Sequence, residues 1–274
     1  MKLSDAVKKL SEAGIEDARR EARVIFTTLG GYSLADLVGT DLKTGNASVI
    51  EAVERRAKRE PLQYILGRVD FYYESYEVSP ACLIPRQDTE MLVDLAVKML
   101  PPGERLLDLC TGSGCVAIST LKNTDGTTAV AVDLSADALK IARENARLNG
   151  VEDRVEFIEK DALSERVEGD FFAVLSNPPY VTEKAYGALA PELYFEPRIA
   201  LVGKGDDGAG FYRRIAELYS ESLKPDGFIA FEIGYDQAGA LAKVAEELGM
   251  SCKIIKDLSG NDRVALLKKQ SHSE

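Results

Sequence analysis

The sequence almost lacks histidine, and this shortage excludes whole classes of enzyme. Its single histidine, His272, stands two residues from the end of a chain of 274. A Ser-His-Asp triad, a Cys-His pair, an HExxH zinc site and a histidine base in a core site are therefore excluded. The four cysteines (Cys82, Cys110, Cys115 and Cys252) form no Cys-x-x-Cys pair, so neither a zinc site nor a disulfide framework is indicated. The chemistry must work without histidine or a cysteine-bound metal.

Long apolar runs are also missing. No stretch reaches the roughly 20 residues that a membrane span needs. The N-terminal string MKLSDAVKKLSEAG mixes charged with apolar residues, unlike a signal peptide. The 34 Lys and Arg are outnumbered by 45 Asp and Glu, which gives a net charge of −11 and argues against phosphate-driven binding to a long nucleic acid. These features predict a cytoplasmic protein that binds neither a membrane nor long nucleic acid directly.

Residues 1–66 read as a small helical domain. Apolar residues from Leu3 to Leu10 share one face of a first helix, and a second over 16–29 is closed by Gly30-Gly31. Ser48 to Glu51 has the form of a capping box that opens a further helix, which Pro61 ends. Residues 69–78 then alternate as two short strands around Glu74-Ser75, which predicts a β-hairpin in a linker that spans 67–84.

Residues 85–274 predict a second, larger domain of the α/β class. After a helix ended by Pro101-Pro102-Gly103, strands are expected near 105–109, 128–133, 155–159, 171–176 and 228–233, and helices near 114–122, 135–149, 209–223 and 237–248. This alternation is typical of a mostly parallel sheet with helices on both faces. The stretch 252–268 predicts two strands joined across 259–261, and hence an antiparallel edge.

A glycine-rich turn follows the first expected strand of this domain. The string Leu107 to Gly114 (LDLCTGSG) lacks the third glycine of a dinucleotide fingerprint and the Lys-Ser/Thr of a P-loop. Asp133 ends the next strand, where a carboxylate can accept hydrogen bonds from two ribose hydroxyls. Asp161 ends the strand after that, where it could accept from an adenine amino group. In this order the three features favour a nucleoside cofactor without a required diphosphate.

The tetrapeptide Asn177-Pro178-Pro179-Tyr180 follows the apolar strand at 171–176. Two prolines fix two φ angles and remove two donors, while Asn177 supplies a side-chain carbonyl and Tyr180 a flat face. Together these groups can hold a planar NH2 group by accepting both of its N–H bonds. Such an arrangement suits methyl transfer to an amide or exocyclic amine, because accepting the protons raises the electron density on nitrogen.

The glycine loop, the strand-end acid and NPPY together resemble class I (Rossmann-like) S-adenosylmethionine-dependent amino-methyltransferases. More narrowly, the chain resembles the HemK/PrmC family, which methylates the glutamine amide nitrogen (N5) in the Gly-Gly-Gln loop of peptide-chain release factors. Strings across most of the chain carry the resemblance: PLQYILG from Pro61, LIPRQDTE from Leu83, EPRIAL from Glu196 and DLSGNDR from Asp257. NPPY alone is shared with methyltransferases of DNA adenine and rRNA guanine.

The resemblance implies S-adenosylmethionine as cofactor, S-adenosylhomocysteine as product, no metal, and a release factor as partner. It implies cofactor contacts from Cys110, Thr111, Gly112, Ser113, Gly114, Asp133 and Asn177, and a position for Ala162 beside the adenine, where relatives often have an aromatic residue. Cys110 replaces the more usual glycine. Asn177, Pro178 and Tyr180 are expected to take part in catalysis, with Pro178, Pro179 and Tyr180 lining the glutamine pocket. The helical domain 1–66 is expected to help hold the release factor.

Several questions stay open at the level of sequence. Arg86, Asp88 and Glu90 fit either orientation of substrate or cofactor, or anchoring of the linker and of the following helix. Glu232 fits either a supporting role at the site or a structural one. A ribosomal protein is an alternative glutamine substrate, and an adenine or guanine amino group in nucleic acid is a weaker one.

Overall fold

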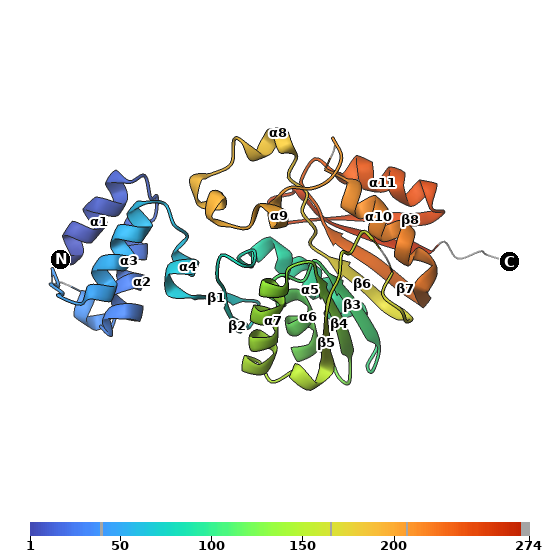
Figure 1. Cartoon of the computed structure of the whole chain (residues 1–274), viewed down its shortest axis with the longest axis horizontal. Coiled ribbons are helices and arrows are strands. Elements are labelled where there is room, and N and C mark those ends of the chain that lie inside the picture. The colour runs from blue at the N-terminus through green and yellow to red at the C-terminus, as the bar shows by residue number, and fades with distance from the viewer. Residues whose placement is uncertain (39–40, 165, 207, 270–274) are drawn as a thin grey trace. The chain divides into compact units, whose positions relative to one another are not determined.

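The computed structural model describes residues 1–38, 41–164, 166–206 and 208–269, so His272 lies outside the described residues. The chain divides into two compact units. The first, here called the helical unit, consists of Met1–Arg68 and the segment Ala190–Phe195; the second, the sheet unit, consists of Val69–Leu189 and the chain from Glu196 onward (Figure 1). No helix within the described residues is long and apolar enough to cross a membrane.

In the described part of the helical unit, four α-helices surround an apolar core. They are α1 (Leu3–Glu12), α2 (Ala18–Gly30), α3 (Ala47–Ala57) and α4 (Leu62–Leu66), with a 3₁₀ turn at Ala35–Leu37. Leu10, Ile25, Phe26 and Val53 are fully buried between them. Gly31 ends α2 in the left-handed conformation, as its place in the sequence predicts.

The predicted start of the third helix was wrong by a few residues. Asn46, and not Ser48, caps α3: its side chain accepts a hydrogen bond from the Ser48 backbone N–H at 2.9 Å. Asparagine is as good an N-cap as serine, and here it precedes the serine in the chain.

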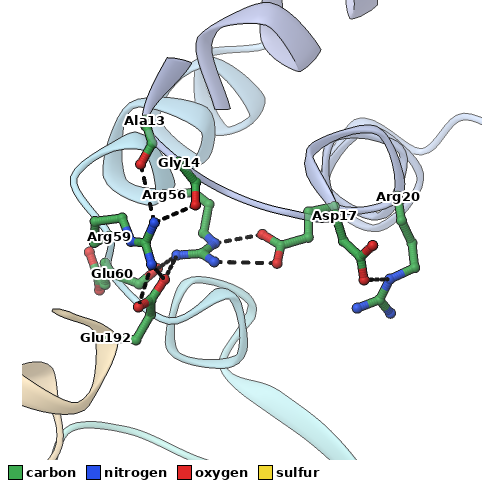
Figure 2. A network of polar contacts seen from close by, with 9 residues as sticks. Ala13, Gly14, Asp17, Arg20, Arg56, Arg59, Glu60 and Glu192 are labelled. Carbon is green, nitrogen blue, oxygen red and sulfur yellow. Dashed lines mark hydrogen bonds and ion pairs between the residues drawn. The ribbon is translucent and has the colours of Figure 1, made fainter. Parts of the chain in front are cut away.

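A network of buried and half-buried charges connects the segment Ala190–Phe195 to the rest of the helical unit (Figure 2). Arg56 donates to Glu21 at 2.5 Å and to Glu192 at 3.1 Å, and Arg59 donates to Glu192 at 2.8 Å. Arg59 also donates to the backbone carbonyl of Gly14 at 2.6 Å. Because Glu192 pairs with both arginines, these contacts attach the segment to the rest of the helical unit.

The sheet unit has a seven-stranded sheet of order β5-β4-β3-β6-β7-β9-β8. Its strands are β3 (Arg105–Leu109), β4 (Thr128–Asp133), β5 (Val155–Glu159), β6 (Phe171–Ser176), β7 (Leu223–Glu232), β8 (Met250–Lys256) and β9 (Asp262–Lys269). The pairs from β5 to β7 are parallel, whereas β9 is antiparallel to both β7 and β8. The predicted parallel sheet with an antiparallel edge is confirmed, although β7 begins earlier than expected.

Helices cover both faces of this sheet (Figure 1). The helices are α5 (Glu90–Met99), α6 (Cys115–Lys122), α7 (Ala136–Leu148), α10 (Gly210–Tyr219) and α11 (Ala238–Glu247), with single turns α8 (Glu183–Tyr186) and α9 (Arg198–Leu201). Successive residues of a strand point to opposite faces. Leu106 therefore packs in the cluster with α5–α7, and Leu107 in the one with α10 and α11.

A two-stranded hairpin precedes the sheet, formed by β1 (Arg68–Phe71) and β2 (Glu74–Glu77). The predicted turn at Glu74-Ser75 was wrong, because the chain turns at Tyr72-Tyr73 with Tyr72 at φ +58°. Glu74 is then free to turn inward, where its carboxylate accepts a hydrogen bond from the Ser119 hydroxyl at 2.7 Å. Tyr73 takes the outward position and is 83% exposed.

The strand order reverses between β3 and β6. From β3 the chain continues to β4 and β5 on one side, and β6 and β7 then extend the sheet on the other side. Open α/β sheets bind ligands at such a reversal, beyond the carboxyl ends of the strands. Both the glycine-rich loop after β3 and Asn177 after β6 stand at this edge.

Candidate active site

A pocket opens at the carboxyl ends of β3, β4 and β6 in the sheet unit. Most of the residues expected at a cofactor site line it: Cys110, Thr111, Gly112, Ser113, Asp133, Asp161, Ala162, Asn177 and Pro179. Gly114, Pro178 and Tyr180 are expected site residues that do not belong to this lining. The chain before α5 adds a further wall, from Ala81 to Thr89.

Asp108 holds the glycine-rich loop from beneath. Its Oδ2 accepts a hydrogen bond from the Thr111 hydroxyl at 2.5 Å and one from the Ala117 backbone N–H at 3.3 Å. The carboxyl group connects the start of the loop to the first turn of α6. Because the side chain is only 1% exposed, desolvation raises the pKa of Asp108 to about 7.

The loop backbone adopts the left-handed conformation at three positions: Cys110 at φ +60°, Gly112 at φ +56° and Gly114 at φ +83°. A Cβ on Gly114 would stand 2.9 Å from Cδ1 of Ile118 and 3.2 Å from Cβ of Ala142, so a side chain there would crowd its neighbours as well as strain the backbone. A Cβ on Gly112 would meet no atom within 4 Å. The backbone at Gly112 is therefore open to a ligand that approaches closely.

Asn145 of α7 supports the same loop. It is fully buried, and its side chain donates to the backbone carbonyls of Ser113 at 2.9 Å and Glu77 at 3.0 Å. Its side-chain oxygen accepts from the Glu77 backbone N–H at 2.7 Å. The amide thus connects the glycine-rich loop to the strand β2.

Asp133 lines the pocket with its carboxylate fixed by backbone donors. Gly112 N–H donates to Oδ2 at 2.8 Å and Ser135 N–H donates to Oδ1 at 2.9 Å. Burial raises the pKa of Asp133, while these N–H bonds oppose the rise. Since a carboxylate has about four lone-pair sites, both oxygens can still accept from a ligand diol.

Asp161 and Ala162 lie on the next part of the wall. Asp161 Oδ1 accepts from the Leu163 backbone N–H at 2.9 Å, so its second oxygen keeps its lone pairs for a further donor. Ala162 is 7% exposed and offers only a methyl group to the pocket.

The NPPY segment divides between the pocket and the core. Asn177 and Pro179 line the pocket, whereas Pro178 is buried and the Tyr180 ring packs against the core beneath α10 and α11. Burial raises the pKa of Tyr180 to about 12, so its hydroxyl keeps its proton at neutral pH. The Tyr180 carbonyl accepts from the Gln237 side chain at 3.3 Å.

Ion pairs connect the sequence strings that carry the family resemblance. Arg86 pairs with Glu196, and Glu196 also accepts from the Ile84 backbone N–H at 3.0 Å. Arg263 pairs with Asp88 at 3.3 Å and with Asp257 at 3.2 Å. These contacts favour the anchoring interpretation of Arg86 and Asp88.

Glu90 has an anchoring contact as well. Its carboxylate accepts from the Tyr72 backbone N–H at 2.8 Å and so attaches the hairpin turn to α5. Glu232 accepts from the Thr89 hydroxyl beside Asn177, which places it in contact with the candidate site.

Sequence reasoning missed three residues that shape the site: Thr89, Asp108 and Asn145. Asp108 had a visible signal, because a carboxylate inside the apolar strand Leu106–Leu109 needs a local donor. Thr89 stands between Asp88 and Glu90, whose charges give a clearer signal than a hydroxyl group does. Asn145 gives no signal, since a helical asparagine is more often exposed.

The sheet order, the glycine-rich loop and the strand-end acid define a class I S-adenosylmethionine-dependent methyltransferase. Residues 87–206 match the family model of the methyltransferase small domain, and residues 2–67 match that of the PrmC N-terminal domain. The solved ribosomal protein L11 methylase of Lactobacillus delbrueckii subsp. bulgaricus has a similar fold, with a TM-score of 0.52 at 20% identity over 70% of this chain and 84% of that one.

Relatives at higher identity narrow this class. The chain is 40% identical to the release factor glutamine methyltransferase of Fusobacterium nucleatum over 280 positions, which cover 98% of this chain and 78% of that protein. It is 37% identical to the enzyme of the same name from Geobacter sulfurreducens, over 93% of this chain and 91% of that one. The chain belongs to the release factor glutamine methyltransferase family, and the resemblance seen in the sequence is confirmed.

Proposed function

We propose that this protein transfers a methyl group from S-adenosylmethionine to the side-chain amide nitrogen, N5, of the glutamine in the Gly-Gly-Gln loop of a peptide-chain release factor. The observation that carries the proposal is one pocket that joins Asn177 and Pro179 to the glycine-rich loop and Asp133. An acceptor for an amide N–H therefore lies beside a site for a nucleoside.

The residues present fit S-adenosylmethionine. Gly112 leaves open space above its backbone, and the carboxylate of Asp133 lines the pocket with lone pairs free for two ribose hydroxyls. We assign the loop from Cys110 to Gly114, together with Asp133, Asp161, Ala162 and Asn177, to cofactor binding. The bound cofactor supplies a methyl group on a sulfonium, which is already a strong electrophile, so no metal is needed to activate it.

The protein's own residues position the glutamine and polarise its amide. The Oδ1 atom of Asn177 accepts one N–H of the substrate amide, and the segment Pro178–Tyr180 shapes the glutamine pocket. With the cofactor bound, the amide nitrogen would form the new bond to the methyl carbon while the electron pair of the broken carbon–sulfur bond stays on sulfur, which leaves S-adenosylhomocysteine as the second product. The methylated amide nitrogen would then give one proton to water. Catalysis comes from positioning and fixed dipoles.

We assign a separate role to each of three segments of the chain. Residues 1–66 recognise the release factor, 67–84 form the hairpin linker, and 85–274 carry the methyltransferase. Connectivity supports a link between recognition and chemistry, because Ala190–Phe195, which begins ten residues after Tyr180, belongs to the helical unit. The partner is a protein of the translation apparatus, which sets the place of action in the cytoplasm, and the −11 charge disfavours direct binding to long nucleic acid.

Labelled S-adenosylmethionine tests this assignment against its alternatives. The protein is incubated separately with release factors, with ribosomal proteins and with nucleic acid, and label in each pool is counted. We expect label in the release factor pool alone. Label in the ribosomal protein pool alone would keep the chemistry and change the substrate, and label in nucleic acid alone would overturn the assignment to glutamine.

A further inference from the structure

Three polar side chains form a hydrogen-bonded chain at the carboxyl ends of β6 and β7. The Nδ2 atom of Asn177 donates to Thr89 Oγ1 at 3.1 Å, and the Thr89 hydroxyl donates to Oε2 of Glu232. Thr89 and Glu232 are each only 2% exposed. The strands β6 and β7 are parallel neighbours, with Ser176 opposite Phe231, so Asn177 and Glu232 follow at the same edge.

The chemistry of the three groups fixes the direction in which each hydrogen bond of this chain is donated. An ionised carboxylate only accepts, so the single hydroxyl proton of Thr89 goes to Glu232. The Thr89 oxygen must then accept, and the only donor on Asn177's side chain is its NH2 group. Within the described residues, none donates a hydrogen bond to Oδ1 of Asn177. The chain therefore fixes the amide with its nitrogen toward Thr89 and leaves its oxygen to accept from a substrate.

We propose that Thr89 and Glu232 are positioning residues for methyl transfer, which hold Asn177 in the one orientation that offers an acceptor to the glutamine amide. This inference rests on the proposed function, since it takes the role of Asn177 as given. It assigns Glu232 a supporting role at the site, an alternative that the sequence left open. Without the chain, the Asn177 amide could turn its NH2 group toward the substrate, where it would oppose the substrate's own NH2 group.

The charge of Glu232 controls the direction of these hydrogen bonds. Burial raises its pKa to about 7, while the hydrogen bond from Thr89 and the positive charges of Arg263 and Arg86 oppose the rise. The ionisable groups that interact electrostatically with Glu232 are Arg86, Asp88, Cys115, Tyr180, Tyr212 and Arg263. When Glu232 is protonated, its own O–H can donate to the Thr89 oxygen. The Thr89 hydroxyl can then donate toward Asn177, whose amide would have to flip so that Oδ1 accepts this hydrogen bond. Activity should therefore rise as pH increases through neutrality.

Single-turnover methyl transfer to a release factor tests the chain, with both ligands saturating. Thr89→Val keeps the shape of the side chain and removes the hydroxyl, and we expect its rate to fall by about 10–100-fold, as for other partners that orient a functional side chain. Thr89→Ser should restore most of the rate. Glu232→Gln should be slower than wild type and should lose the rise with pH. Adding Thr89→Val to Asn177→Ala should cost nothing further, because the two act through one group.

These outcomes separate the inference from the proposed function. If the wild type methylates the release factor and Asn177→Ala is slow while Thr89→Val keeps the wild-type rate, the positioning role is overturned and the function stands. A wild type that transfers no methyl group would instead reject the proposed function.

The positioning role then has its own readout in the side-chain amide resonance of Asn177, identified by its loss in Asn177→Ala. We expect this resonance to shift with pH through neutrality in the wild type and to stay constant in Glu232→Gln. A resonance that is indifferent to pH in the wild type would overturn the proposed chain without any assay of activity.

Discussion

Replacing two glycines of the loop after β3 by alanine should have different effects, one mainly on cofactor binding at Gly112 and one mainly on stability at Gly114. Both adopt the left-handed conformation, which costs an alanine about 1–2 kcal/mol. At Gly114 the new methyl group also meets Ile118 at 2.9 Å and Ala142 at 3.2 Å, and overpacking of this kind adds about 1–3 kcal/mol. We therefore expect Gly112→Ala to lose about 1–2 kcal/mol of unfolding free energy and Gly114→Ala about 2–5 kcal/mol.

The affinity for S-adenosylmethionine should not follow the loss of stability in these two variants. The Gly112 methyl group meets no protein atom within 4 Å, and the residue lines the pocket, so we expect the methyl group to block the approach of a ligand. Gly112→Ala should stay folded and bind S-adenosylmethionine weakly. Gly150→Ala is the matched control, because Gly150 has φ +67°, equally open space and no place in the pocket lining. It should lose the same stability as Gly112→Ala and bind normally.

Urea unfolding followed by circular dichroism measures the stability changes, since the chain has no tryptophan for fluorescence. Titration calorimetry measures the binding of S-adenosylmethionine. Equal losses of stability at Gly112 and Gly114 would refute the packing argument. Wild-type affinity in Gly112→Ala would refute the placement of the cofactor against this backbone.

Three further predictions concern charged groups. Asp133→Ala should weaken S-adenosylmethionine binding by about 1.5–3 kcal/mol through lost charge-assisted hydrogen bonds, whereas the exposed neighbour Asp137→Ala should bind normally in the same calorimetry. Burial raises the pKa of Asp108 to about 7, so in mildly acidic solution the native state binds more protons than the unfolded state, and stability falls as pH rises toward 7. In thermal melts at several pH values, Asp108→Asn should show a smaller fall in stability over this range. A fall as steep as that of the wild type would contradict the raised pKa of Asp108. Arg56→Ala should lose about 3–5 kcal/mol because it leaves Glu21 without its ion-pair partner and takes one of two arginine partners from Glu192. Arg147→Ala, which breaks an exposed pair with Glu144, should lose at most about 1 kcal/mol in urea unfolding.

Much of the sheet unit could be predicted because its signals are local. The strands β3, β4 and β6 are short apolar runs between turn residues, and the helices that follow them have a clear apolar face. The hairpin turn could not be placed in the same way. Its position depends on Glu74 turning inward to Ser119 of α6, a contact between residues 45 apart in the chain.

The site shows the same limit. The glycine-rich loop, Asp133 and Asn177 have recognisable types at recognisable spacings, and the structure places them on one pocket. Thr89 and Glu232 carry no such spacing, since they meet Asn177 only when the start of α5 and the ends of β6 and β7 come together. The backbone conformation of Cys110 could not be predicted either. Its φ of +60° lies in the left-handed region, where a glycine would be less strained.

The most direct test of the proposed function is the chemical identity of the methylated atom. A release factor is incubated with the protein and S-adenosylmethionine, digested, and its Gly-Gly-Gln peptide sequenced by mass spectrometry, alongside a release factor whose loop glutamine is changed to glutamate. We predict one added methyl group on the side chain of that glutamine and none on the glutamate variant, which has no amide nitrogen. A methyl group on any other residue, or equal methylation of the glutamate variant, would contradict the proposal.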